Sequence, residues 1–273
     1  APTGLCRCCA AAALAVATAS GCASGRPNRV TEHRPGSAPV LRHRMNLDEL
    51  VAFASRDPLG FLRFCRDHCA KTVVDYRCRF HRRERVGGRL VPEEQMEVRF
   101  RQSPYSVRFE WVDRGGPASS VTYVAGRWMK DGQEHALIHP SGLLGLLVPR
   151  GVKRDIHGPD MREASAHGID EFGFLKTLDA ILEVCDRASA RDELELRYAG
   201  RDAHDDRASL VIERRLPYDG SSEDYPNRRL RILLDAEWLL PVACYGYAAE
   251  GAQELVGCFT TTDVRLNVGL GED

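Results

Sequence analysis

The strongest constraint on the fold is a two-residue alternation of apolar and charged side chains that begins at residue 75. In "DYRCRFHRRER", Tyr76, Cys78 and Phe80 fall on one face of an extended chain. The segments "EQMEVRFRQ" and "SVRFEW" repeat this pattern, with these apolar positions: Met96, Val98, Phe100, Val107, Phe109 and Trp111. Such alternation is typical of half-buried strands. The sequence therefore predicts an antiparallel meander with one side in water.

The other face of these three strands is strongly basic. It carries the following arginines: Arg77, Arg79, Arg99, Arg101 and Arg108. Two interpretations stay open, a solvated outer face and a surface that docks an acidic partner or anionic lipid. The formal net charge of −1 argues against a dedicated nucleic-acid binder.

The first turn of the meander is constrained by register. A two-residue loop at Gly87-Gly88 would set Phe80 opposite Gln95 and place charged residues on the apolar face. A three-residue loop at 87–89 sets Phe80 opposite Met96 and Cys78 opposite Val98. The pattern therefore predicts the three-residue form.

Helices are predicted before the meander and in the middle of the chain. Asn46 and Glu49 have the spacing of a capping box, and Asp57 followed by Pro58 starts a second helix. The segment "FGFLKTLDAILEVCDRA" (172–188) places Leu178 and Leu182 on one apolar stripe. Strand patterns resume at "LELRYAG" and continue to "DVRL", where the tip "AAEGAQ" forms a hairpin that would make Cys244 and Cys258 neighbours, as a possible disulfide.

These elements predict an α+β fold. A strongly curved antiparallel sheet would form an unclosed half-barrel, with the N-terminal helices and the inserted amphipathic helix as its lid.

The first 44 residues indicate where the protein works. Residues 1–22 resemble a signal peptide with a lipobox, in which Ala19-Ser20-Gly21 precedes an acylated Cys22. Residues 23–44 hold five arginines and no apolar periodicity, so we expect a disordered basic tether ahead of a single domain at 45–273. The interpretation is an exported envelope protein, anchored in a membrane on its periplasmic side by lipid. The alternative is an ordinary secretory peptide in which Cys22 is incidental.

The folded part resembles a bacterial envelope family, domain of unknown function 1571, and more distantly the LolA/LolB-like lipoprotein carriers. The similar segments are "DYRCRFHRRERVGGRL", "VRFRQSPYSV", "YVAG", "LDAEWLLPV" and "DVRLNVGL". The resemblance implies a LolA-like half-barrel with an apolar concavity for an acyl chain or a lipoprotein.

Three functional hypotheses follow. The first is non-catalytic binding of a lipid, an acyl chain or a lipoprotein, with these lining candidates: Tyr76, Phe80, Met96, Val98, Phe100, Val107, Phe109, Trp111, Leu178 and Leu182. The second is an envelope interaction or sensor module with a filled core that docks through the basic face. An enzyme is the third and is disfavoured, because the sequence has no GxSxG, HExxH, P-loop or GxGxxG. No cofactor or metal is predicted; His135 and His139 share a face of a strand, and acids cluster in the loop at 202–206.

Overall fold

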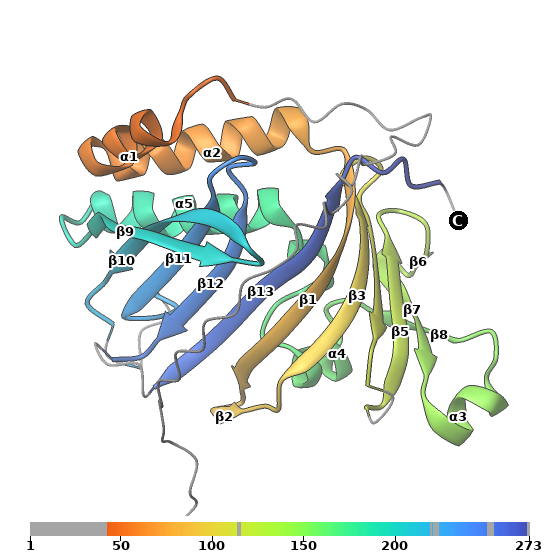
Figure 1. Ribbon diagram of the computed structural model, residues 1–273. Coiled ribbons are helices and arrows are strands. Elements are labelled where there is room, and N and C mark those ends of the chain that lie inside the picture. The colour runs from red at the N-terminus through yellow and green to blue at the C-terminus, as the bar shows by residue number, and fades with distance from the viewer. Residues whose placement is uncertain (1–42, 114–115, 219, 221–223, 250–253, 272–273) are drawn as a thin grey trace, which may run out of the picture. The chain divides into compact units, whose positions relative to one another are not determined.

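The computed structural model describes residues 43–113, 116–218, 220, 224–249 and 254–271 (Figure 1). The predicted signal peptide with Cys22, and nearly all of the predicted tether at 23–44, lie outside these residues.

Two helices lead into the sheet, and their starting residues agree with the predicted caps. Helix α1 spans Leu47–Arg56 and α2 spans Pro58–Thr72. The Asn46 side chain accepts a hydrogen bond from Glu49 N at 3.0 Å, and the Glu49 carboxylate accepts one from Asn46 N at 2.7 Å. The Asp57 carboxylate accepts from Gly60 N at 2.8 Å. These contacts satisfy amide groups that a helix N-terminus otherwise leaves unpaired.

One antiparallel sheet dominates the described chain. Its strand order is β6-β7-β5-β4-β3-β1-β13-β12-β11-β10-β9, with β2 paired to β1 and β8 paired to β7. The strands are β1 (Asp75–Val86), β2 (Arg89–Leu90), β3 (Glu94–Arg101), β4 (Ser106–Trp111), β5 (Ala118–Val124), β6 (Met129–Lys130), β7 (Gln133–Pro140), β8 (Val152–Asp155), β9 (Glu195–His204), β10 (Arg207–Arg215), β11 (Arg229–Asp235), β12 (Pro241–Tyr247) and β13 (Leu255–Leu266). The two ends of this order, β6 and β9, do not pair with each other within the described part of the chain. The predicted α+β class with an unclosed sheet is confirmed.

The register of the meander is the one that the apolar pattern predicts, but the turn is not. Phe80 lies opposite Met96, and Cys78 lies opposite Val98. The turn itself has only two residues, because Val86 pairs with Arg89 across Gly87 and Gly88, which have φ of +56° and +81°. One additional residue lies in the connection between β2 and β3, and it shifts β3 by one position from the register that the turn alone would give. The predicted three-residue loop is therefore wrong, although the register it was meant to explain is right.

Helix α5 (Phe174–Ser189) contacts β12 and packs along α2, while α1 and α2 also contact β9 (Figure 1). Its inward residues Leu178 and Cys185 are 0% exposed, as are Cys65 and Cys69 on the facing side of α2. The inserted helix therefore fills one half of the concave side. Three short helices connect β7 to α5, namely α3 (Gly142–Leu147), α4 (Pro159–Ala164) and η1 (Ile169–Glu171).

The hairpin of β12 and β13 corrects the predicted cysteine pair. Cys244 lies opposite Phe259 and Cys258 lies opposite Tyr245, so the two thiols are on opposite faces, and both are free. The cause is a register shift between Gly246 and Tyr247. Tyr247 pairs with Leu255, and this register, if continued, would place Cys244 opposite Cys258. The bulge shifts the pairing by one residue, so that Cys244 meets Phe259 instead.

Candidate functional site

The concave face of β1, β3 and β4 brings the predicted lining residues together. Seven of the ten candidates are buried in one hydrophobic cluster: Tyr76, Met96, Val98, Phe100, Val107, Leu178 and Leu182, with exposed fractions of 0–8%. The stacked rings of Tyr76 and Phe100 have centroids 4.8 Å apart, and Phe174 of α5 lies 4.6 Å from Tyr76. Packed side chains therefore fill this part of the concave face.

The remaining three candidates, Phe80, Phe109 and Trp111, are only half-buried. Phe80 and Phe109 meet the ring of Phe172, with centroids 5.1 Å and 4.9 Å away, and Phe80 stacks at 6.4 Å on Phe259 of β13. We call these five side chains, Phe80, Phe109, Trp111, Phe172 and Phe259, the aromatic cluster. All five are partly open to solvent. The cluster is therefore an apolar surface on the concave side that the fold covers incompletely.

Charged residues continue the same inward face of β1 beyond the aromatic cluster. Glu84 is 2% exposed, and its Oε1 accepts hydrogen bonds from Ser165 Oγ at 2.9 Å and lies 3.2 Å from Arg82 Nη1. Its Oε2 has no hydrogen-bond partner among the described residues. Arg82 also pairs with Glu94, which accepts from Trp111 Nε1 at 3.1 Å. The aromatic cluster is thus bordered by a buried acceptor with spare capacity.

The segment between β8 and α5 also borders the aromatic cluster, through His167. His167 stacks edge-on against Phe259 at 5.4 Å and forms an ion pair with Glu171 at 3.7 Å. This contact raises the pKa of His167, and the nearby charge of Glu84 acts in the same direction. Sequence reasoning missed Arg82 and Glu84. The signal was present, because both continue the inward series 76, 78 and 80 by steps of two.

The outer face of the sheet carries an arginine row, which we define as Arg265, Arg77, Arg99 and Arg108. These residues stand directly opposite one another across β13, β1, β3 and β4. Like charges directly opposite each other destabilise a sheet. Arg77 and Arg265 have no ion-pair partner within the described residues. An open depression of about 310 Å³ lies beside them and is lined by Arg77, Cys78, Arg79, Glu97, Asp263 and Arg265.

The other predicted basic residues are mostly engaged. Arg79 pairs with Glu97 at 3.0 Å and Asp263 at 3.5 Å, and Arg101 donates to Gly271 O at 3.3 Å. Arg108 binds Glu110 at 2.6 Å, whereas Arg99 is 4.0 Å from the same carboxylate. The uncompensated positive charge therefore lies at Arg77 and Arg265. Arg265 was not among the predicted basic residues, since it lies far along the chain.

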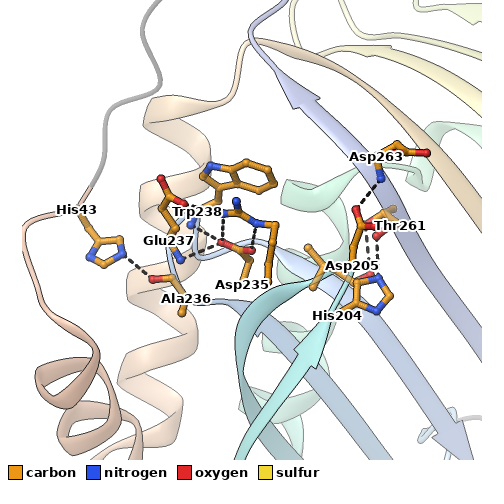
Figure 2. Close-up of polar contacts among 11 residues, drawn as sticks. His43, His204, Asp205, Asp235, Ala236, Glu237, Trp238, Thr261 and Asp263 are labelled. Carbon is orange, nitrogen blue, oxygen red and sulfur yellow. Dashed lines mark hydrogen bonds and ion pairs between the residues drawn. The ribbon is translucent and has the colours of Figure 1, made fainter. Parts of the chain in front are cut away.

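The predicted loop at 202–206 is the end of β9 and the turn to β10, and two of its residues hold this hairpin against β13. Asp205 Oδ2 accepts from Asp263 N at 2.7 Å, and His204 Nε2 lies 2.8 Å from Thr261 O (Figure 2). In the same view, Asp235 accepts from the backbone N–H groups of Glu237 and Trp238 at 2.9 and 2.7 Å. These carboxylates act as structural acceptors. No group of three His, Cys, Asp or Glu side chains suited to a metal ion occurs in the described ranges, and His135 and His139 both lie on β7.

A family model described as "Protein of unknown function (DUF1571)" matches residues 73–273. No curated protein matches the chain.

Among solved structures, the chain is similar to the Pseudomonas aeruginosa MucA/MucB complex, with 15% identity and a TM-score of 0.40 over 80% of this chain and 59% of that one. It is similar to the lipoprotein LppX of Mycobacterium tuberculosis, with 12% identity and a TM-score of 0.40 over 80% and 100%. It is also similar to a LolA superfamily protein of Nitrosomonas europaea, with 7% identity and a TM-score of 0.24 over 76% and 93%.

Proposed function

The chain belongs to the DUF1571 family, and from this premise we propose that it is a non-catalytic envelope protein that binds an acyl chain on the concave side of its sheet. The observation that carries the proposal is the aromatic cluster. It gathers five half-buried aromatic side chains, of which Phe80, Phe109, Phe172 and Phe259 are linked by ring contacts, next to a part of the concave face that buried side chains fill. In the proposal, lipid on Cys22 keeps the domain beside a membrane, which is the source of such ligands.

The chemistry of the cluster favours a long apolar ligand. Each aromatic ring offers a large apolar surface, and burying apolar surface contributes roughly 25 cal/mol per Å². Ligand sites in general are mostly apolar with few polar groups that fix orientation. Here Glu84 Oε2 supplies an unused acceptor at the border. A hydrogen-bond donor on the ligand's head group would satisfy it.

The test is titration of the full chain with a fluorescent acyl probe whose head group can donate hydrogen bonds, such as the glycerol ester of parinaric acid. We expect saturable binding, and the double variant Phe80→Ala, Phe109→Ala weakens it by about tenfold or more, because two apolar contact surfaces are lost. The matched control is Tyr245→Ala, which removes a half-buried aromatic ring on the opposite face of the sheet. It should bind as the wild type does. Equal affinity of the double variant and the wild type, with circular dichroism showing both folded, would refute the proposal.

A second candidate function rests on the arginine row. Four arginines in register, two of them unpaired in the described chain, form a surface for an acidic partner. Tripolyphosphate, used as a probe, should raise the Tm of the wild type and leave that of Arg77→Gln, Arg265→Gln unchanged. An equal shift in both proteins would refute an anion site at this row.

A further inference from the structure

Helix α3 presents an unusual apolar surface. Four of its six residues are leucines, and their exposed fractions are 79% for Leu143, 63% for Leu144, 77% for Leu146 and 75% for Leu147. They are the most exposed of the large apolar residues in the described chain. Scattered single apolar residues are normal on a protein surface, whereas four together mark an interaction site.

The local structure holds these leucines outward. Gly145 faces the carbonyl of Pro140, and a Cβ at this position would lie 2.4 Å from that oxygen. The preceding Ser141 donates its backbone N–H to Pro117 O at 3.0 Å, which ties the start of the helix to the loop between β4 and β5. The helix therefore turns its glycine towards the sheet and its leucines away. This is the reverse of the usual arrangement, in which a surface helix buries its apolar stripe.

Basic residues follow the leucines directly. Arg150 and Lys153 are exposed and have no ion-pair partner in the described ranges, and Arg154 pairs with Asp160 at 3.3 Å. Val112, which is 47% exposed, lies at the same end of the sheet, because β4 and β7 both run antiparallel to β5 and end at Trp111 and Pro140. Leucines flanked by cations have the chemistry that anionic lipid surfaces attract.

We propose that α3 inserts its leucines into the interfacial layer of an anionic lipid bilayer. A helix of six residues is about 9 Å long, so it reaches into the headgroup and upper acyl region without spanning the membrane. Within the described chain, no helix is long and apolar enough to cross a bilayer. The inference is independent of the proposed ligand site, since it rests on α3 and its flanks alone.

The test uses the full chain carrying Cys22→Ala, so that no acyl anchor contributes, with phosphatidylcholine vesicles that contain or lack phosphatidylglycerol. In this background, the triple variant Leu143→Ser, Leu146→Ser, Leu147→Ser removes the inserted side chains. We expect partitioning into the anionic vesicles to fall roughly threefold per leucine, or about thirtyfold in total. The variant Arg150→Gln, Lys153→Gln should lose most of the preference for phosphatidylglycerol.

The matched control is Val74→Ser, Met129→Ser, which removes two exposed apolar side chains at the other end of the sheet. It should partition as the parent does. A site-specific readout comes from Leu146→Trp, whose fluorescence lipids brominated along the acyl chain should quench. Unchanged partitioning of the triple variant overturns the proposal, as does an unquenched tryptophan at 146. The proposal also fails if sedimentation shows that the serine changes only dissociate copies of the chain from one another.

Discussion

Asn267, directly after β13, tests how the C-terminal segment is held against the junction between α2 and β1. Its Nδ2 donates to Thr72 O at 2.8 Å, and its Oδ1 accepts from Val74 N at 2.8 Å. The residue is 2% exposed and has a φ of +53°. One side chain thus caps the last turn of α2 and fixes the start of β1, in a left-handed conformation that asparagine tolerates better than most residues. The perturbation is Asn267→Ala.

The magnitude follows from these contacts. Alanine leaves a buried carbonyl and a partly buried N–H without partners, which costs about 1–3 kcal/mol each. Alanine at positive φ adds about 1 kcal/mol. The expected loss is about 3–7 kcal/mol, a large share of the roughly 5–15 kcal/mol that typical domains have. Asn267→Gly loses the same hydrogen bonds without the backbone strain, so it should be about 1 kcal/mol less destabilised. Asn267→Asp keeps the acceptor for Val74 N but sets a buried carboxylate oxygen against Thr72 O, so it should be at least as destabilised as alanine.

The assay is urea unfolding of the full chain, followed by circular dichroism with the m-value compared among variants. The order of stability should be wild type, glycine and alanine, with aspartate no more stable than alanine. A loss below about 1 kcal/mol for alanine would show that water replaces both contacts. Equal stability of the alanine and glycine variants would show that the left-handed conformation carries no cost there.

Three other outcomes are expected. Leu178→Ala should lower the free energy of unfolding by about 2–5 kcal/mol in the same urea assay, because this side chain is 0% exposed in the half that α5 fills; a loss under 1 kcal/mol would contradict a filled core. Iodoacetamide at about pH 8 should modify Cys258 before any other described cysteine, because Cys258 is half-exposed and the others are buried. Burial raises the pKa of Cys69 and of Cys244 to about 12, and it raises the pKa of Cys258 as well. Mass spectrometry measures the labelling, and rapid labelling of the buried thiols would contradict the packing. Arg207→Lys should lower Tm, because lysine cannot reproduce the paired hydrogen bonds to Asp235 at 2.6 and 3.0 Å or the stacking at 3.5 Å on Trp238; an unchanged Tm would show that the charge alone matters.

Much of the fold was predictable because its signals are local or periodic. Caps at Asn46 and Asp57 act within one helical turn, so the sequence around them suffices. The register of β1 with β3 was predictable because a slip by one residue would exchange the apolar and charged faces. The turn between them was not, since an extra residue can be absorbed at several positions without changing that register. The bulge at Gly246 and Tyr247, which separates Cys244 from Cys258, leaves no such pattern.

The candidate site was predictable in part for the same reason. The alternation identified the concave face, and the structure adds which of its side chains stay half-open: Phe80 and Phe109 do, whereas Tyr76 does not. That distinction depends on α5 and on Phe172, which arrive from distant parts of the chain. The pairing of Arg265 with Arg77 likewise depends on strand order, because β1 is the first strand in the sequence and β13 is the last.

The three surfaces differ in their place on the sheet, and this separates the functions they support. Helix α3 follows the end of β7, at the same end of the sheet as Trp111 of the aromatic cluster. The arginine row crosses the sheet on the other face and lies nearer the opposite end, where Asp75 pairs with Arg101. A bilayer that takes up the leucines end-on would therefore lie close to the concave aromatic rings and leave the arginine row turned away from it. On this arrangement one lipid surface cannot serve both the leucines and the arginines, so an anionic ligand of the row would be a separate partner. Membrane contact and acyl binding can then share one end of the sheet, while the opposite face remains free for that partner.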